Sequence, residues 1–394
     1  MEQLVQEPQD ANISPEIEEQ IESGYVPEED APLTLSPAER RLITQPYDLV
    51  VRTIISQMDD KSMIVNPPYQ RGYVWDNARA SKLIESLLLN IPIPPCYFAE
   101  EETGVVTVID GQQRLKSIWR YVKDDFSLRG LKALPEYSSL KFSKLKEREQ
   151  RIILGRTIRC IVISQESHPE IRFEVFERLN TGAMQLTDQE IRNAIFRGDF
   201  NDLIKGLAEQ PRWIGALGKQ MLDKRMRDDE LVVRLFAVNT GFLEYKAPLR
   251  TFLNNYTRGM VRLPDKTERK LTPNEIAQLT NLFENTVDKV SNVFNGHAFR
   301  AYNHTTQSWE RQINRALFDA VTLVFSKLPF DVLLANRLEI VNSLIRLCAN
   351  SEFLTAISRS TADRGSFLKR IHMFSEAMAA VGLDSGIHQI IPQD

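Results

Sequence analysis

The pattern of apolar residues changes near residue 200, and this change limits the chain to a mixed fold. Before it, strand-like runs at 62–66, 97–99, 105–109 and 157–163 are interleaved with helical periodicity at 48–58, 76–89, 143–154 and 169–179. After it, only helical periodicity is found, at 226–245, 272–295, 309–327, 330–348 and 366–381. We therefore predict an α+β protein with a tail at 1–35, an α/β domain at 36–200 and an all-helical domain at 201–394.

Local signals mark where several helices begin. Capping boxes are found at 36–39, 187–190 and 272–275, and Asp76 is a candidate N-cap residue. A further helix is expected directly after residues 110–114, where Leu115, Ile118 and Val122 fall on one face.

The charge is unevenly distributed. Residues 1–30 hold ten acids and no base, whereas residues 31–394 hold 49 Lys and Arg against 43 Asp and Glu, a net charge of +6. An acidic, aromatic-poor segment buries too little apolar surface to offset its ordering entropy, so we expect the tail at 1–35 to be disordered. Two roles remain open for it: a solubilising leader, or an acidic mimic that occupies a basic groove of the same protein until nucleic acid displaces it.

The composition also bears on location. No apolar run approaches the ~18–20 residues needed to span a bilayer, and the N-terminus lacks the basic start and apolar stretch of a secretory signal. Cys96, Cys160 and Cys348 are far apart and include no CxxC pair, so no disulfide framework is expected. We expect a cytoplasmic protein without membrane contacts.

The most specific local feature is the segment Asp110-Gly111-Gln112-Gln113-Arg114, which lies between a predicted strand and a predicted helix. Such a turn directs backbone N–H groups and the positive end of the helix dipole at one point, and phosphate is the usual occupant. Arg114 can grip phosphate oxygens in a two-pronged geometry, both glutamines can bond phosphate, sugar or base, and Asp110 can hold Mg²⁺ or orient a water. The simpler alternative is that Asp110 is a helix cap and Arg114 forms a surface ion pair. The chain contains no GxxxxGK[ST] phosphate loop.

Three other segments bear on this site. The loop at 67–75 mixes aromatic residues with Gln70 and Arg71, and is either a packed crossing or a binding loop. The segment at 176–182 ends a predicted helix, with Gly182 as a candidate C-cap. On the next predicted helix, the polar side chains are most simply a solvated face: Asp188, Glu190, Arg192 and Asn193.

Together these segments resemble a known family. PPYQRGYVW (67–75), IESLLLNIPIPPCYF (84–98), IDGQQRLKSI (109–118) and FERLNTGAMQLTDQEIRNA (176–194), in that order, resemble the N-terminal domain of GmrSD-type restriction endonucleases. That family is similar in fold to ParB and sulfiredoxin. The resemblance thus implies that residues 36–200 form a ParB/sulfiredoxin-like nucleotide-binding domain, which in several relatives hydrolyses nucleoside triphosphates. In relatives the domain acts in defence against foreign DNA and gates an attached His-Asn-His nuclease.

The resemblance also implies which residues act. Asp110 and Arg114 are the expected catalytic residues, with Mg²⁺ on Asp110 as the expected cofactor. The expected nucleotide-binding residues are Gln70, Arg71, Gly111, Gln112, Gln113, Asn180, Thr181 and Gly182.

The departures from the family are informative. Sulfiredoxin chemistry needs a cysteine in the phosphate loop, and residues 110–114 contain none. A His-Asn-His nuclease needs clustered histidines, but the five here are scattered, and Asn303-His304 is most simply a coincidence. No zinc-binding spacing is found, so no zinc is expected. A nuclease or methyltransferase partner would be a separate chain, and a homo-oligomer remains open.

Nucleic-acid binding is a separate question. Base-rich stretches lie at 141–159, at 250–270 and at 359–372, and Lys144, Arg148 and Arg151 in the first are candidate DNA contacts. Each stretch taken singly is more simply a solvated face. The resulting hypothesis is a nucleoside-triphosphate-binding and hydrolysing sensor of a DNA restriction or phage-defence system that acts with a separate effector. The alternative is a non-hydrolysing ParB-like module that binds DNA or protein; an autonomous nuclease is not expected.

Overall fold

The computed structural model describes residues 36, 40–65, 73–100, 104–179, 186–223, 225–263 and 267–392. The tail at 1–35 and most of the expected capping box at 36–39 lie outside the described residues. The chain divides into two units, which we call the sheet unit, ending at Ile195, and the helical unit, beginning at Phe196.

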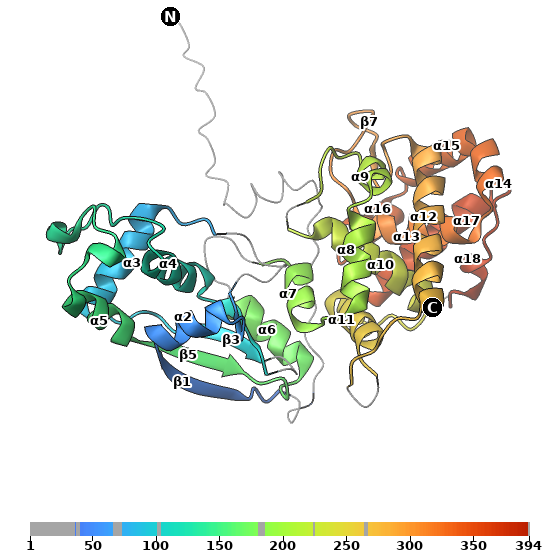
Figure 1. Cartoon of the computed structure of the whole chain (residues 1–394). Coiled ribbons are helices and arrows are strands. Elements are labelled where there is room, and N and C mark those ends of the chain that lie inside the picture. The colour runs from blue at the N-terminus through green and yellow to red at the C-terminus, as the bar shows by residue number, and fades with distance from the viewer. Residues whose placement is uncertain are drawn as a thin grey trace, which may run out of the picture. The chain divides into compact units, whose positions relative to one another are not determined.

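A mixed five-stranded sheet forms the frame of the sheet unit (Figure 1). Its strand order is β1-β5-β3-β4-β2. The strands are β1 (Thr44–Val50), β2 (Met63–Ile64), β3 (Cys96–Glu100), β4 (Val106–Asp110) and β5 (Thr157–Ile163). β1 is antiparallel to β5, β3 is parallel to β5 and antiparallel to β4, and β2 is parallel to β4. The strands predicted at 97–99, 105–109 and 157–163 are confirmed, whereas the one predicted at 62–66 is only the two residues of β2.

Helices cover both faces of this sheet. They are α2 (Val51–Asp59), α3 (Asn77–Leu89), α4 (Gln112–Val122), α5 (Glu147–Gly155), α6 (Pro169–Leu179) and α7 (Asp188–Ile195). Phe98, Val108 and Ile158 belong to the apolar core that α2 to α5 share. The alternate strand positions Ala99 and Ile109 are buried too, and α6 contacts β4. Because side chains alternate across a strand, these two sets belong to opposite faces of the sheet.

Two predictions in this unit are wrong in their bounds. The helix expected at 48–58 begins only at Val51, because Thr44–Val50 pairs along its whole length with β5. Most of β1 is exposed, so its sequence carries no apolar alternation to reveal a strand. The helix expected at 143–154 begins at Glu147, after a 3₁₀ turn at Phe142–Lys144.

The helical unit packs around one central helix, α13 (Arg315–Lys327), whose residues Ala316 to Phe325 are all buried. Around it lie the other helices: α8 (Asp199–Ala208), α9 (Pro211–Ala216), α10 (Arg227–Gly241), α11 (Leu249–Val261), α12 (Pro273–Phe294), α14 (Phe330–Ala335), α15 (Arg337–Leu347), α16 (Ser351–Ser358), α17 (Arg364–Ala379) and α18 (Ile387–Ile390). A helix that is apolar all round is expected at the centre of a bundle.

The helical character of this half is confirmed, with local exceptions. A small hairpin of β6 (Tyr302–Asn303) and β7 (Ser308–Trp309) precedes α13, so the helix predicted from 309 begins at Arg315. The helix predicted at 330–348 is two helices, α14 and α15. Five helices were not predicted: α8, α9, α11, α16 and α18. Within the described residues, no helix is both long and apolar enough to cross a membrane.

Candidate phosphate-binding site

The turn between β4 and α4 is built on a close approach of two strands. Gly111 is the N-cap residue of α4 and has a φ of 107°, a conformation that favours glycine. A Cβ built on Gly111 would lie 2.9 Å from Cys96 Cβ and closer still to its Sγ. Cys96 is fully buried at the start of β3. Glycine is therefore required here by packing within the sheet, independently of any ligand.

The carboxylate of Asp110 and the guanidinium of Arg114 form an ion pair at this turn. Arg114 Nη2 donates to Asp110 Oδ2 at 2.5 Å, and Nη1 donates to the carbonyl oxygens of Pro94 at 2.5 Å and Pro95 at 3.1 Å. The Arg114 side chain is 14% exposed, whereas that of Asp110 is 43% exposed. Arg114 therefore does more than form a surface pair: it ties the strand-entry segment at 94–95 to α4 and holds Asp110 toward solvent.

The Cys96 thiol beside the turn adds no negative charge to that of the Asp110 carboxylate. Burial raises the pKa of the Cys96 thiol to about 11, and the nearby Arg114 offsets only part of this rise. The thiol is therefore neutral at physiological pH. The N-cap residue of α4 supplies no side-chain hydrogen bond, so the positive end of the helix dipole is not capped by a carboxylate or hydroxyl at that position.

The glutamines of the motif connect α4 to the loop at 67–75. Gln113 Oε1 accepts hydrogen bonds from the backbone N–H groups of Val74 at 3.0 Å and Trp75 at 3.3 Å. Tyr73 hydroxyl lies 2.9 Å from Ser117 Oγ, one turn further along α4. Gln112 is buried, and its Oε1 accepts from Gln113 Nε2 at 3.4 Å. The structure thus brings three of the four motif segments, 67–75, 84–98 and 109–118, together at the start of α4.

Five of the predicted site residues lie outside the described residues: Gln70, Arg71, Asn180, Thr181 and Gly182. The described chain resumes at Tyr73, whose hydroxyl contacts Ser117 of α4. α6 ends at Leu179, directly before the Asn-Thr-Gly segment.

The polar side chains of α7 do not form a solvated face, contrary to the expectation from sequence. Glu190 is 1% exposed and Arg192 is fully buried. Arg192 Nη1 donates to Gln189 Oε1, and Gln189 Nε2 donates to Asn193 Oδ1 at 3.0 Å. Their burial follows from packing of α7 against α6, which the spacing of polar residues along one helix cannot reveal.

Mg²⁺ requires oxygen ligands, and the side chains at the turn offer one carboxylate, that of Asp110. Within the described ranges, no group of three or more His, Cys, Asp or Glu side chains could hold a metal ion. Nucleotide-associated Mg²⁺ is commonly held by one or two carboxylates and by the phosphates themselves. Asp110, half-exposed and bound through Oδ2 only, fits the role of that single protein ligand.

The three base-rich stretches differ in the structure. In the second, Arg250 is buried, Arg269 pairs with Glu275, and Lys270 pairs with Glu268 at 2.7 Å. In the third, Arg370 is fully buried and Lys369 lies 3.4 Å from Glu352. In the first, Lys144 and Arg148 are exposed and have no ion pair among the described residues, while Arg151 pairs with the exposed Glu147 at 3.3 Å. The first stretch thus keeps Lys144 and Arg148 available, although Arg159 in the same stretch pairs with Asp48 at 2.7 Å.

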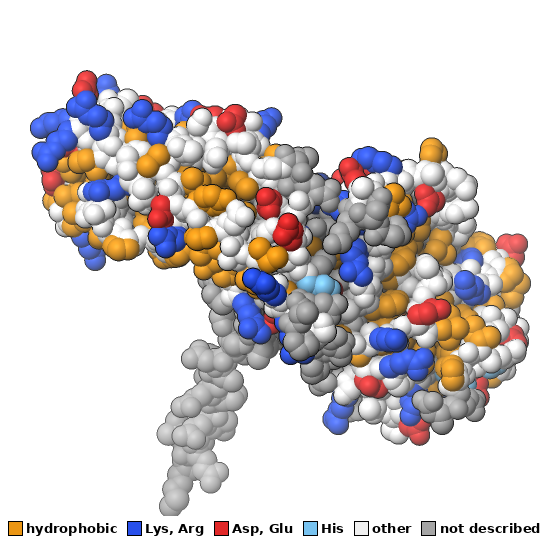
Figure 2. Space-filling model, turned by 90° about the horizontal axis from the view of Figure 1, so that it is seen from below, with side chains coloured by type: hydrophobic (Ala, Val, Ile, Leu, Met, Phe, Trp, Pro, Cys, Tyr) orange, Lys and Arg blue, Asp and Glu red, His pale blue; other side chains and the backbone are white. Residues whose placement is uncertain are grey.

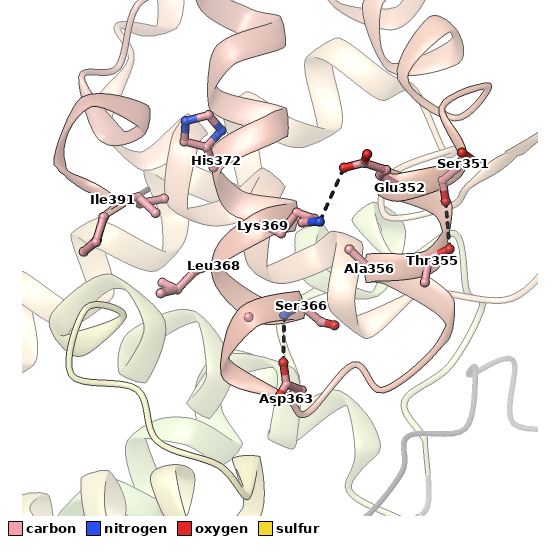
Figure 3. A pocket seen from close by; sticks show the side chains of 12 residues that line it. Ser351, Glu352, Thr355, Ala356, Asp363, Ser366, Leu368, Lys369, His372 and Ile391 are labelled. Carbon is pink, nitrogen blue, oxygen red and sulfur yellow. Dashed lines mark hydrogen bonds and ion pairs between the residues drawn. The ribbon is translucent and has the colours of Figure 1, made fainter. Parts of the chain in front are cut away.

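A cavity of about 680 Å³ lies in the helical unit, not at the motif (Figure 3). Side chains of α16 and α17 line it, and the loose Lys369–Glu352 ion pair crosses it. Sequence reasoning did not identify this cavity, because its residues come from segments that carry no recognisable motif.

The comparison with protein families agrees with the geometry. Residues 51–197 match the family model described as "GmrSD restriction endonuclease, N-terminal domain". This range contains the β4–α4 turn, the helices around it and α7. No curated protein matches the chain. Residues 51–197 are therefore similar to the N-terminal domain of GmrSD restriction endonucleases.

Proposed function

We propose that the β4–α4 turn binds the phosphates of a nucleoside triphosphate, and that the protein is a nucleotide-dependent switch of a DNA restriction or phage-defence system. The observation that carries the proposal is the start of α4, where a close-packed glycine with a φ of 107° lies between a strand and the first turn of the helix. The family match to a restriction endonuclease domain supports the setting.

The residues of the turn take separate roles in this proposal. The phosphates lie at the start of α4, where the positive end of the helix dipole favours negative charge. Arg114 orients the Asp110 carboxylate through their 2.5 Å contact, and its positive charge adds to the field at the phosphates. Mg²⁺ would supply charge neutralisation of the phosphates, with Asp110 as its protein ligand.

Hydrolysis at such a site depends on electrostatic stabilisation rather than a covalent intermediate, because in this proposal the Asp110 carboxylate binds Mg²⁺ instead of attacking phosphorus. The alternative function is a module that binds nucleotide without turnover and uses it to hold DNA or a partner protein. The tight engagement of Arg114 with Pro94, Pro95 and Asp110 favours this alternative to the extent that it keeps the guanidinium from the phosphates.

The test compares Asp110→Asn with Asp125→Asn. Asp125 also forms an ion pair with an arginine of α4, Arg120, at 3.6 Å, and its side chain is 44% exposed, close to that of Asp110. We expect Asp110→Asn to weaken Mg²⁺-dependent binding of nucleoside triphosphates at least about tenfold by calorimetry and to abolish phosphate release, with Asp125→Asn unchanged. Equal binding and release by wild type and Asp110→Asn would exclude the assignment. Binding without phosphate release in the wild type would select the non-hydrolysing module.

A further inference from the structure

Lys and Arg side chains gather on residues 129–151, which we call the basic segment. Its seven bases are exposed: Arg129, Lys132, Lys141, Lys144, Lys146, Arg148 and Arg151. The same residues include three acids, Glu136, Glu147 and Glu149. Among the described residues the bases make one ion pair, Arg151–Glu147, whose side chains are 71% and 83% exposed and which is correspondingly weak. Figure 2 shows blue side chains gathered at the end of the sheet unit that carries α5.

The basic segment is held on a packed scaffold rather than on a loose loop. Leu128, Leu131 and Leu145 are buried in the core of the sheet unit. Asp124 Oδ1, just after α4, accepts a hydrogen bond from the backbone N–H of Ser143 at 2.9 Å. Tyr121 of α4 packs against Phe142 with ring centroids 6.0 Å apart. The backbone that carries the bases is therefore anchored next to the C-terminal end of α4.

The side chains around the basic segment indicate which kind of polyanion it binds. None of the exposed large hydrophobic side chains of the described residues lies between 123 and 156. A membrane-binding surface would present such side chains beside its bases, and a site for single strands would present exposed aromatic rings for stacking. Bases without either are suited to the phosphate backbone of a duplex.

The basic segment and the Gly111 turn lie at opposite ends of one helix. Asp110 and Arg114 are at the start of α4, whereas Asp124 and the basic segment follow its end at Val122. Eleven helical residues span about 16 Å. We infer that the basic segment binds the phosphate backbone of a nucleic-acid duplex while the phosphates of a nucleotide occupy the start of α4, so that both ligands bind at the same time. The second half of this inference rests on the proposed nucleotide site.

The test measures binding of the full chain to a fluorescein-labelled DNA duplex of about 30 base pairs by anisotropy, at several salt concentrations. The test variant is Lys144→Glu/Arg148→Glu. The control is Lys327→Glu/Arg337→Glu, two exposed bases of the helical unit with the same change in net charge. We expect the test variant to bind about tenfold or more weakly at 0.1 M salt and to lower the salt slope by about 1 for each lost contact. The control should stay within about twofold.

The same experiment separates the two halves of the inference. Saturating nucleoside triphosphate with Mg²⁺ should leave duplex affinity within about twofold of its value without nucleotide. Displacement of the duplex by nucleotide would overturn simultaneous binding. Equal affinity of test and control variants, or stronger binding to vesicles of 30% phosphatidylserine than to the duplex, would overturn the duplex surface. Because nucleotide binding of Lys144→Glu/Arg148→Glu is measured separately by calorimetry, a failure of the nucleotide site is distinguishable from a failure of the basic segment.

Discussion

Gly111 illustrates how a residue in a functional motif can be fixed by packing. Its positive φ and its approach to Cys96 are both unfavourable for a side chain. We expect Gly111→Ala to destabilise the protein by about 3 kcal/mol, since it adds backbone strain to an overpacked contact. Urea unfolding measures this change in free energy.

Two further variants separate these causes. Gly104 also has a positive φ, 79°, but a Cβ there would meet nothing within 4 Å, so Gly104→Ala reports backbone strain alone. Removing the facing thiol in Gly111→Ala/Cys96→Ala should recover part of the loss by relieving the steric contact. A cost for Gly111→Ala no larger than that of Gly104→Ala would show that the contact with Cys96 does not matter.

Asp229 makes the helical unit sensitive to pH. It is 3% exposed at the start of α10, and burial, reinforced by the charge of Asp228, raises its pKa to about 7. Because the folded-state pKa exceeds the unfolded value of about 3.9, Asp229 is protonated in the folded protein and ionised in the unfolded chain between about pH 4 and 7. The contribution of Asp229 to stability is therefore fully present below about pH 4 and falls as the pH rises toward about 7.

Asp229→Asn removes this titration. We expect the variant to gain stability relative to wild type between about pH 4 and 7, by up to about 4 kcal/mol, and to keep a constant advantage above that range. Chemical unfolding across the pH series measures the difference. Asp202→Asn, at an exposed position of the neighbouring α8, is the control. A difference that does not change with pH would refute the assignment to Asp229.

At the scale of the element, the start of α7 can be predicted from the sequence, but the burial of its polar side chains cannot. Its capping box is confirmed: Glu190 N–H donates to Thr187 Oγ1 at 3.2 Å, and Thr187 N–H donates to Glu190 Oε2 at 2.6 Å. The spacing of Thr and Glu suffices to predict this local pattern. The burial of Glu190 and Arg192 depends on neighbours elsewhere in the chain.

We expect Thr187→Ala to cost about 1 kcal/mol by removing the N-cap hydrogen bond, and Thr187→Ser to cost much less because it keeps the hydroxyl. Hydrogen exchange of α7 amides compares the variants. Equal protection of α7 in wild type and Thr187→Ala would mean that packing alone determines its start.

At the scale of the whole molecule, a buried charge cluster joins three helices of the helical unit. Asp319 of α13 accepts from Arg234 of α10 at 2.7 and 3.0 Å and from Arg370 of α17 at 2.8 Å. All three residues are fully buried. No sequence pattern indicates this cluster, and Arg370 lies in the base-rich stretch at 359–372, where a solvated face was the simpler expectation.

We expect Asp319→Asn to destabilise the helical unit by about 3–5 kcal/mol, because two buried guanidinium groups lose their counter-charge. Hydrogen exchange should show faster opening of α10, α13 and α17 and no change in the sheet of residues 44–163. Asp331→Asn, exposed at the start of α14, is expected to change stability by less than about 0.5 kcal/mol. Equal effects of both variants on the free energy of unfolding would show that the cluster does not stabilise the protein.

The predicted fold was most accurate where interactions are local. α3 begins at its predicted cap Asp76, α6 has its predicted bounds, and the β3–β4 hairpin follows two short apolar runs. The strand β1 and the helices α11 and α16 were not predicted; β1 is mostly exposed and is ordered by its pairing with β5, far along the chain.

For the candidate site, the sequence identified the motif but not what its residues contact. The order of four segments indicated the resemblance to the family, and the predicted strand–glycine–helix pattern at residues 109–115 is confirmed by β4, Gly111 and α4. Only the structure placed Arg114 against the carbonyls of Pro94 and Pro95, and Gln113 against the backbone at 74–75.

The sequence by itself thus determined the α+β class, the family resemblance of residues 51–197 and the starts of the capped helices α3, α7 and α12, because caps and periodicity act over a few residues. The tertiary structure alone decided which charges remain available. It buried Arg192 and Arg370 and left Lys144 and Arg148 exposed without partners among the described residues. The physical reason is that desolvation and ion pairing depend on neighbours brought together by folding, which no local pattern of charged residues specifies.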